Sequence, residues 1–306
     1  MENRNRMVNQ QERPLFLLMV HAWPRQFHLL WKLLERQDAY YVVHYDAKAS
    51  LPIKTLVRWL TNGHRNAAVL PTRPIHWGGW SQVQVQLDAM ALAVRRGWSW
   101  SHYIGLSGQC LPIKPLQHFR SFLQKSGSCS FLELKDPANR ESGLRWFDPW
   151  TGMEDTSYRV EYAYDESARA PGPRLCGRGP VRLSNQRMPW PQDIQLRGGA
   201  SWVVLHRNHC QHLLTSPAAA RIKELLRHSA NPDEIFFQTA LYNSPFTSEV
   251  NDQLLWEIDW VRGAPYTWSA SDLDALRQSP AFFARKFDLA SARKIISRFQ
   301  TDLTLS

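Results

Sequence analysis

LFLLMVHA at residues 15–22 is a continuous apolar run, and YYVVHYDA at residues 40–47 is a second run of the same kind. Between them, Pro24 opens a segment whose apolar residues recur at helical spacing, namely Phe27, Leu30, Trp31, Leu33 and Leu34. Apolar runs without alternation are typical of strands buried on both faces of a parallel sheet. These residues predict a β-α-β unit at this end of the chain.

The alternation of strand and helix continues. AAVLP at 67–71 and SHYIGLSG at 101–108 have strand character, and a helix between them ends at Gly97. That helix has an apolar face made of Val83, Leu87, Met90 and Val94. GGASWVVLHR at 198–207 is a further predicted strand, followed by a helix through LLRHSA and another from NPDE onwards. The sequence predicts an α/β fold with a mostly parallel central sheet flanked by helices, whose ligands gather beyond the carboxyl ends of the strands.

A chain of 306 residues, 43% of them hydrophobic, is long enough for one large domain or for two fused lobes. We predict a single domain over residues 1–306, in which residues 1–13 form a polar leader. Residues 14–135 and 198–306 hold the regular elements and form its two halves. Residues 136–197 lose the periodicity and are rich in Pro, Gly and Arg, so we expect an irregular insertion there.

The chain is basic, with 37 Lys and Arg against 27 Asp and Glu and a formal net charge of +10. This charge suits a nucleotide diphosphate, a nucleic acid or an anionic membrane surface. The basic residues are spread along the whole chain, which argues against nucleic acid as the main partner. No stretch approaches the roughly 20 apolar residues of a membrane span, and the first residues are polar. We expect a cytoplasmic protein with peripheral contact to an anionic membrane surface, the inner membrane.

Polar residues follow three of the apolar runs. Val20 and His21 end the first run, Asp46 follows the second, and Gly108 and Gln109 follow the strand that begins at residue 101. In nucleotide-binding α/β proteins, a carboxylate at the end of the second strand often contacts a ribose, so Asp46 is a candidate for such a contact. An aspartate that caps a turn or a helix explains the same residue equally well.

IHWGGWS at 75–81 joins a predicted strand to a helix. Gly78 and its neighbour allow close approach of a ligand to the backbone, and Ser81 is able to cap a helix whose N-terminus favours anions. Trp77 and Gly78 are therefore candidates for the wall of a ligand site. A tight turn followed by a capped helix explains these residues equally well.

Asn231, Pro232, Asp233 and Glu234 have the order of a helix start, with a cap, a proline in the first turn and acidic side chains at the positive end of the dipole. This structural role leaves a catalytic role open. A carboxylate at a rigid helix end is well placed to take a proton from a bound hydroxyl group, so Glu234 is a candidate general base.

Taken in order, eight segments resemble one known family. They are VHAWPRQFHLLWKLL, YYVVHYDAKAS, RPIHWGGWSQVQVQLDAM, SHYIGLSGQCLPIKP, SFLEL, GGASWVVLHRNHC, NPDEIFFQTALYNSP and FFARKFD, covering roughly residues 15 to 290. The set is similar to the core-2/I-branching β-1,6-N-acetylglucosaminyltransferases and the related peptide O-xylosyltransferases. The resemblance implies a GT-A-like fold and a metal-independent, inverting transfer from a UDP-sugar to a glycan or related acceptor. It also assigns residues 14–135 to nucleotide-sugar binding, 136–197 to the acceptor side and 198–306 to catalysis and diphosphate binding.

Site residues follow from the same resemblance. Glu234 matches the family's catalytic base, Lys286 matches its diphosphate-binding lysine, and Arg262 is the nearest match to its second cation. Glu133 and Trp256 are expected to contact the acceptor. The other donor-binding residues expected from the match are Val20, His21, Asp46, Trp77, Gly78, Gly108 and Gln109. At position 110, directly after Ser-Gly-Gln, this chain has cysteine where many bacterial relatives have aspartate.

No cofactor or metal is expected. The only Asp-x-Asp triplet, Asp272 to Asp274, follows Ser271 at the start of a helical run and is read as helix-end acid. The cysteines lack metal-ligand spacing and are expected to be reduced thiols: Cys110, Cys129, Cys176 and Cys210.

Two other functions compete with this reading. A glycosidase needs two carboxylates set apart across the bond, whereas Asp233 and its neighbour Glu234 are adjacent. A non-catalytic sugar- or nucleotide-binding protein on the same fold has no need for both Glu234 and Lys286. The sequence leaves open whether N-acetylglucosamine or xylose is transferred, because the choice depends on packing around the sugar.

Overall fold

The computed structural model describes residues 13–35, 38–137, 158–167, 180–263 and 265–303. Seven strands form the central sheet in the order β10-β6-β9-β4-β1-β2-β3. These strands are β1 (Arg13–Val20), β2 (Tyr40–Tyr45), β3 (Ala67–Val69), β4 (Trp100–Ser107), β6 (Ser130–Leu132), β9 (Val204–His206) and β10 (Val250–Asp252). The four strands β4, β1, β2 and β3 are mutually parallel, and β9 is antiparallel to both of its neighbours. The predicted mostly parallel sheet is confirmed.

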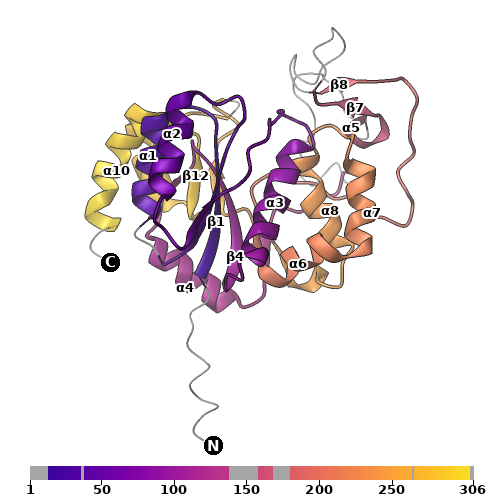
Figure 1. Ribbon diagram of the computed structural model, residues 1–306. Helices are drawn as coiled ribbons and strands as arrows, with labels where there is room; N and C mark the ends of the chain where they lie inside the picture. Colours follow the sequence, from indigo (N-terminus) through magenta and orange to yellow (C-terminus); the bar gives the residue numbers. More distant parts are fainter. Residues whose placement is uncertain (1–12, 36–37, 138–157, 168–179, 264, 304–306) are drawn as a thin grey trace, which may run out of the picture.

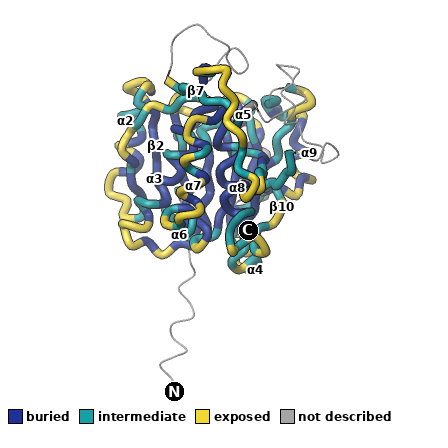
Figure 2. Tube along the Cα trace, turned by 90° about the vertical axis from the view of Figure 1, so that its right-hand side faces the viewer, coloured by how far each residue is buried: buried dark blue, intermediate teal, exposed yellow. Residues whose placement is uncertain are grey.

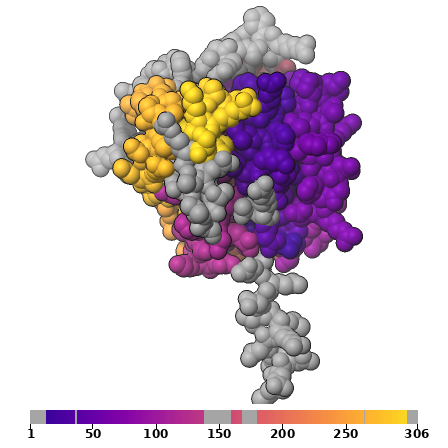
Figure 3. Space-filling model, turned by 90° about the vertical axis from the view of Figure 1, so that its left-hand side faces the viewer, coloured from indigo at the N-terminus to yellow at the C-terminus, as the bar shows by residue number. Residues whose placement is uncertain are grey.

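Helices cover both faces of the sheet (Figure 1). One face carries α1 (Pro24–Leu34), α2 (Leu51–Thr61), α4 (Leu116–Ser126) and α10 (Leu289–Leu303), and the other carries α3 (Ser81–Arg95), α6 (Arg207–Thr215), α7 (Pro217–Leu226) and α8 (Phe236–Tyr242). Figure 3 shows the first face, where the yellow α10 lies directly against the indigo N-terminal segment. Side chains of β1 alternate between two cores, because Phe16 and Leu18 face one helical layer while Leu15 and Leu17 face the other. Both layers are buried where they meet the sheet, and exposed residues lie at the rim (Figure 2).

Smaller elements complete the described part. A second sheet has the order β11 (Trp256–Ile258), β12 (Phe283–Arg285) and β5 (Leu111–Pro112), and β7 (Tyr164–Asp165) pairs with β8 (Val181–Arg182). The short helices are α5 (Tyr158–Glu161), η4 (Pro232–Glu234), η5 (Thr247–Glu249), η6 (Ala270–Asp272) and α9 (Leu273–Gln278). None of the helices within these described ranges has the length and apolar character needed to cross a membrane.

The predicted β-α-β unit is confirmed as β1, α1 and β2. The helix α2 was not among the predicted elements, although its buried residues Ile53, Val57 and Leu60 recur at helical spacing. The strand expected over 198–207 is only three residues long, since Gly198 forms only an isolated bridge with Lys135 and residues 199–203 are irregular backbone. Much of the leader and of the irregular segment, residues 1–12, 138–157 and 168–179, lies outside the described residues.

Candidate functional site

The predicted strand ends meet at one edge of the sheet. The Asp46 N–H donates to the Val20 carbonyl oxygen at 3.0 Å, and the Gly108 N–H donates to the Met19 carbonyl oxygen at 3.1 Å. A Cβ atom at Gly108 would lie 3.4 Å from Val20 Cγ1, so the two backbones are close neighbours. Parallel pairing of β2, β1 and β4 causes this convergence, because it places their carboxyl ends side by side.

The Asp46 carboxylate organises the backbone around it. Its Oδ1 accepts the Lys48 N–H at 2.7 Å, and its Oδ2 accepts the Ile75 N–H at 3.2 Å. The Lys48 Nζ lies 3.8 Å from Oδ2. Asp46 thus has the turn-stabilising role that the sequence left open, and it stands beside the strand ends as well.

His21 and Lys286 add to this cluster. Burial lowers the pKa of His21, the Asp46 carboxylate opposes that shift, and the cations Lys48 and Lys286 lower the pKa further. Lys286 is therefore electrostatically close to His21, although 265 positions separate them in the chain (286 − 21). Its carbonyl oxygen accepts the Trp268 N–H at 2.8 Å, which anchors the backbone at Lys286.

Gln109 connects the end of β4 to the segment after β12. The Phe287 N–H donates to the Gln109 carbonyl oxygen at 3.1 Å, and Gln109 Nε2 donates to the Phe287 carbonyl oxygen at 3.4 Å. Gln26 Nε2 donates to the same carbonyl at 2.6 Å. These bonds hold Lys286, the residue before Phe287, next to Gly108 and the strand ends.

Arg262, which the family match assigns as the second cation at the diphosphate, is bound by two carboxylates of its own segment. Its Nε lies 2.5 Å from Asp259 and its Nη1 lies 2.6 Å from Asp272. Its guanidinium carbon lies 4.0 Å from the ring centre of Tyr266, whose carbonyl oxygen accepts the Lys286 N–H at 3.3 Å. The two carboxylates already compensate the charge of Arg262, so it braces the segment beside Lys286.

The turn at 75–81 lies between Asp46 and Glu234. At one end Ile75 binds Asp46, and at the other the Gly78 carbonyl oxygen accepts the Asn231 N–H at 2.8 Å. Gly78 has φ 74° and a Cβ there would lie 2.5 Å from Asn231 Oδ1, so this position requires glycine. Trp77, between these anchors, is 44% exposed. Trp77 and Gly78 therefore lie on the segment that joins the Asp46 turn to the Asn231 backbone.

Ser81 does not cap α3, contrary to the expectation. Its Oγ accepts the His76 N–H at 2.8 Å and donates to Glu166 Oε2 at 2.9 Å. The Glu166 carboxylate also accepts the Ser81 N–H, at 2.9 Å, and thus binds a free backbone donor at the start of the helix. The hydroxyl group is used to close the turn, because the preceding residue Trp80 is already helical.

The sequence predicts that Glu234 lies at the start of an α-helix. In the structure it lies instead on a single 3-10 turn. Asn231 has φ 49° and makes no side-chain cap, and α8 begins only at Phe236. The turn closes through the Glu234 N–H, which donates to the Asn231 carbonyl oxygen at 3.1 Å. Ile235 interrupts the helix with φ −130°, so the dipole of α8 does not act on Glu234 as expected.

Arg159 is the partner of the Glu234 carboxylate. Its Nη1 lies 2.7 Å from Glu234 Oε2, its own side chain is 7% exposed, and the Glu234 side chain is 31% exposed. A buried cation thus holds a carboxylate that remains open to solvent. The sequence had no signal for this pair, because Arg159 belongs to the segment without periodicity.

Asp233 points away from that pair into the protein. Its Oδ2 accepts Gln82 Nε2 of α3 at 3.4 Å. Burial raises the pKa of Asp233 above its usual range, and the charge of Glu234 raises it further. The two adjacent carboxyl groups therefore have different environments, and of the two only Glu234 is accessible to solvent.

Glu133 lies next to the turn that holds Glu234. The Gly199 N–H donates to the Glu234 carbonyl oxygen at 3.0 Å, and a Cβ at Gly199 would meet the Glu133 carbonyl oxygen at 2.1 Å. Glu133 Oε2 accepts the Ala200 N–H at 3.0 Å. Gly199 is therefore the close backbone contact that brings a predicted acceptor residue and the predicted base together.

Trp256 occupies the core and has no surface to offer an acceptor, which corrects the expectation. It is 3% exposed, its ring stacks on Phe283 at 5.2 Å between centroids, and it also contacts Trp202. The reason is its place on β11, where it pairs with Phe283 in register. The sequence around Trp256 did not show which face of this strand is buried.

Cys110 is fully buried next to the strand ends. Its Sγ lies 3.4 Å from Ser107 Oγ, and it interacts with Arg285, whose pKa is lowered by burial against the opposing influence of the Cys110 thiol. Cys110, Cys129 and Cys210 are free thiols, and Cys176 lies outside the described residues.

The Asp-x-Asp triplet has the structural role predicted for it. Asp272 accepts the Ser269 N–H and Oγ at 2.9 and 2.8 Å in a capping box, and Asp274 is 87% exposed at its side chain. Within the ranges that the structure describes, no group of three His, Cys, Asp or Glu side chains is placed to hold a metal ion.

The chain matches one protein family and is similar to several xylosyltransferases. The profile of the Core-2/I-Branching enzyme family matches residues 15–277. Xylosyltransferase 2 of Rattus norvegicus is 24% identical over 304 residues, which is 92% of this chain and 32% of that protein. Xylosyltransferase 1 of Homo sapiens is 24% identical over 306 residues, 92% and 29% of the two chains, and a xylosyltransferase of Ciona intestinalis is 25% identical over 309 residues, 94% and 34%. The chain spans about a third of the length of these relatives.

Proposed function

Because this chain belongs to the core-2/I-branching enzyme family, we propose that it is a glycosyltransferase that moves a sugar from a UDP-sugar to a hydroxyl group of a glycan or related acceptor. One observation carries the proposal: the turn at 75–81 connects a strand-end cluster that includes Lys286 to the accessible carboxylate of Glu234. An inverting transfer without a metal ion needs these two groups, a cation for the leaving diphosphate and a base for the acceptor.

The donor occupies the strand-end cluster in this proposal. The backbone at Val20 and Gly108 lines the uridine part, with Asp46 and His21 beside it, and Trp77 forms the wall toward the sugar. Lys286 contacts the diphosphate. Two contacts support this arrangement, since the strand ends pair directly and Asp46 anchors the turn before Trp77. The influence of Lys286 in lowering the pKa of His21 is consistent with it.

The transfer inverts the anomeric carbon in this proposal. Glu234 removes the proton of the acceptor hydroxyl group while that oxygen forms a bond to the anomeric carbon, and the bond from this carbon to the diphosphate oxygen breaks on the opposite side. Lys286 stabilises the negative charge that the departing UDP acquires. Arg159 fixes the orientation of the Glu234 carboxylate, and Glu133 contacts the acceptor beside it.

Metal independence is part of the proposal. Lys286 supplies the charge that a divalent ion supplies in many transferases of this general type. The Asp272 carboxylate is already bound by Arg262 and Ser269, which supports a structural role for the Asp-x-Asp triplet. Arg262 is given a positioning role, because its guanidinium packs over Tyr266 next to Lys286.

The test is a screen of UDP-sugars against the purified chain. UDP-N-acetylglucosamine and UDP-xylose are compared for the shift they cause in thermal midpoint and for the release of UDP, with UDP-glucose and ADP-glucose as controls. One of the two first donors should stabilise the protein and yield free UDP, and an added glycan acceptor should accelerate the release. Stabilisation by a donor without any turnover would favour the non-catalytic binding protein, and no effect of any UDP-sugar would reject both functions.

A further inference from the structure

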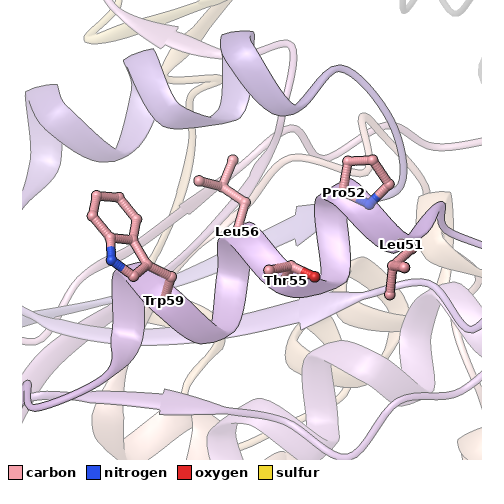
Figure 4. Close-up of a pocket in the computed structure, with 5 residues that line it drawn as sticks. All are labelled: Leu51, Pro52, Thr55, Leu56 and Trp59. Carbon is pink, nitrogen blue, oxygen red and sulfur yellow. The ribbon is translucent and has the colours of Figure 1, made fainter.

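The outer face of α2 exposes large apolar side chains that the proposed reaction does not use. Leu51 is 74% exposed and Trp59 is 66% exposed, at opposite ends of the helix. Together with Pro52, Thr55 and Leu56 they line an open groove of about 460 Å³ (Figure 4). We call these five residues the α2 face.

Apolar side chains lie on both the inner and the outer side of α2. Ile53, Val57 and Leu60 lie in the core and Leu56 packs partly against it, so the exposed Leu51 is not part of the packing that holds α2 on the sheet, and Trp59 contacts only the edge of α1 through His28, with ring centroids 6.1 Å apart. The exposed Leu51 and Trp59 side chains line the same groove. Exposed apolar side chains that gather at one place are typical of interaction surfaces, whereas single scattered ones are not.

Charge identifies the kind of partner. Residues 47–87 contain no Asp or Glu, and Lys54, Arg58 and Arg65 lie on or directly after α2. Lys54 Nζ donates to the Ala47 carbonyl oxygen at 3.0 Å, and Arg58 Nη2 donates to the Tyr45 hydroxyl at 3.3 Å. These acceptors are neutral, and among the residues that the structure describes neither Lys54 nor Arg58 forms a salt bridge, so both keep their positive charge at the surface.

We propose that the α2 face docks the protein on an anionic lipid surface. Tryptophan and leucine enter the boundary between headgroups and acyl chains, while neighbouring Lys and Arg contact the anionic headgroups. The α2 helix lies beside α1 at the periphery of the fold (Figure 1), and its outward side chains Leu51 and Trp59 are exposed. Lys48, close before Leu51, belongs to the donor cluster, so docking through α2 would hold the donor site near the lipid surface.

The experiment measures co-sedimentation with vesicles in the absence of any UDP-sugar, so its result is independent of whether the chain transfers sugar. Vesicles of phosphatidylcholine are compared with vesicles that also contain phosphatidylglycerol. Binding should be at least about tenfold stronger to the anionic vesicles and should fall steeply in about 0.5 M NaCl, because salt screens the attraction. Equal binding to both vesicle types, or none to either, would overturn the proposal.

Two variants test the residues. Leu51→Ser with Trp59→Ser should reduce binding about tenfold or more, and Lys54→Gln with Arg58→Gln should reduce it roughly 10- to 30-fold, in anionic vesicles only. The matched control is Trp260→Ser with Val261→Ser, another exposed pair of a tryptophan and an aliphatic residue, 49% and 80% exposed. The proposal fails if this control loses as much binding as the α2 variant. It also fails if Leu51→Ser with Trp59→Ser instead dissociates a dimer of the free protein in sedimentation velocity.

Discussion

Arg159 Nη1 lies 2.7 Å from Glu234 Oε2, although 75 positions separate the two residues. Arg159 comes from α5 in the irregular segment, and Glu234 comes from the turn before α8. Asp233 is buried, and its neighbour Glu234 is open to solvent. The ion pair therefore places a fixed cation beside the exposed one of these two carboxylates. Its consequences for turnover can be measured.

Glu234→Gln should abolish most turnover and leave donor binding intact. Glutamine keeps the shape and some hydrogen bonding but lacks basicity, so the transfer rate should fall about 10²- to 10⁴-fold. The affinity for UDP-sugar should stay near the wild-type value, whereas the thermal midpoint should fall, because the buried Arg159 loses its charged partner. The variant should still fold, since the 3-10 turn closes through backbone atoms. Transfer at the normal rate by a folded, donor-binding variant would reduce Glu234 to a structural residue.

Arg159→Met should lower kcat with little change in the donor KM, because Arg159 acts through Glu234. In the Glu234→Gln background the same substitution should have almost no further effect on turnover, as expected for residues that act as a unit. Arg159→Lys should restore part of the rate. Arg187→Met is the control, since Arg187 forms a surface pair with Glu161 at 2.7 Å in the same part of the chain. Additive losses in the double variant would contradict a role through Glu234.

Lys286→Ala should weaken UDP binding roughly tenfold to a hundredfold and reduce turnover as well. A charged hydrogen bond to the diphosphate contributes both to the bound donor and to the departing UDP. Titration calorimetry with UDP measures the first effect, and Lys125→Ala, at an exposed site on α4, serves as the control. Unchanged UDP affinity in Lys286→Ala would remove this lysine from the donor site.

Chelation should leave the transfer rate unchanged. If Lys286 supplies the charge for the leaving group, EDTA has no ion to remove from the reaction. The rate is measured before and after treatment with EDTA, and then with added manganese. Loss of activity on chelation, restored by manganese, would reject the metal-independent mechanism, whereas the Lys286→Ala result would still report on donor binding.

Stability should fall in mild acid because of two buried histidines far from the proposed site. His102 and His209 lie between β4, β6 and α6, where His209 Nδ1 is 2.6 Å from Ser130 Oγ and His102 Nε2 is 3.1 Å from the Cys129 carbonyl oxygen. Burial lowers the pKa of both from 6.5 to about 4; the charge of His206 acts in the same direction, and Glu249 opposes it at His209.

The unfolded chain therefore binds protons before the folded chain does. Their contribution to stability is complete above about pH 6.5 and is lost progressively as the pH falls to about 4, with a slope of up to about 1.4 kcal/mol per pH unit for each histidine. Urea unfolding across this range measures the slope. His209→Gln should flatten it and His118→Gln, at an exposed position, should not. Equal slopes in all three proteins would exclude the buried histidines as the cause.

Much of the fold follows from local patterns in the sequence. The apolar runs of β1 and β2, with the helical spacing between them, were sufficient for the β-α-β unit, because each of these elements buries a regular set of its own side chains. Parallel pairing then required the carboxyl ends to meet, so Val20, Asp46 and Gly108 could be placed together in advance. The position of Lys286 beside them came only from the family resemblance.

Other parts of the site depended on contacts between distant segments. The pairing of Arg159 with Glu234, the anchoring of Ser81 by Glu166 and the burial of Trp256 have no local signature, since each depends on which face of a segment meets another part of the chain. The same is true of the outer face of α2, because local spacing does not show that Leu51 and Trp59 stay exposed. Local spacing determined the strands and the strand-end cluster, whereas tertiary packing decided which carboxylate is accessible, which cation holds it and which apolar side chains remain exposed.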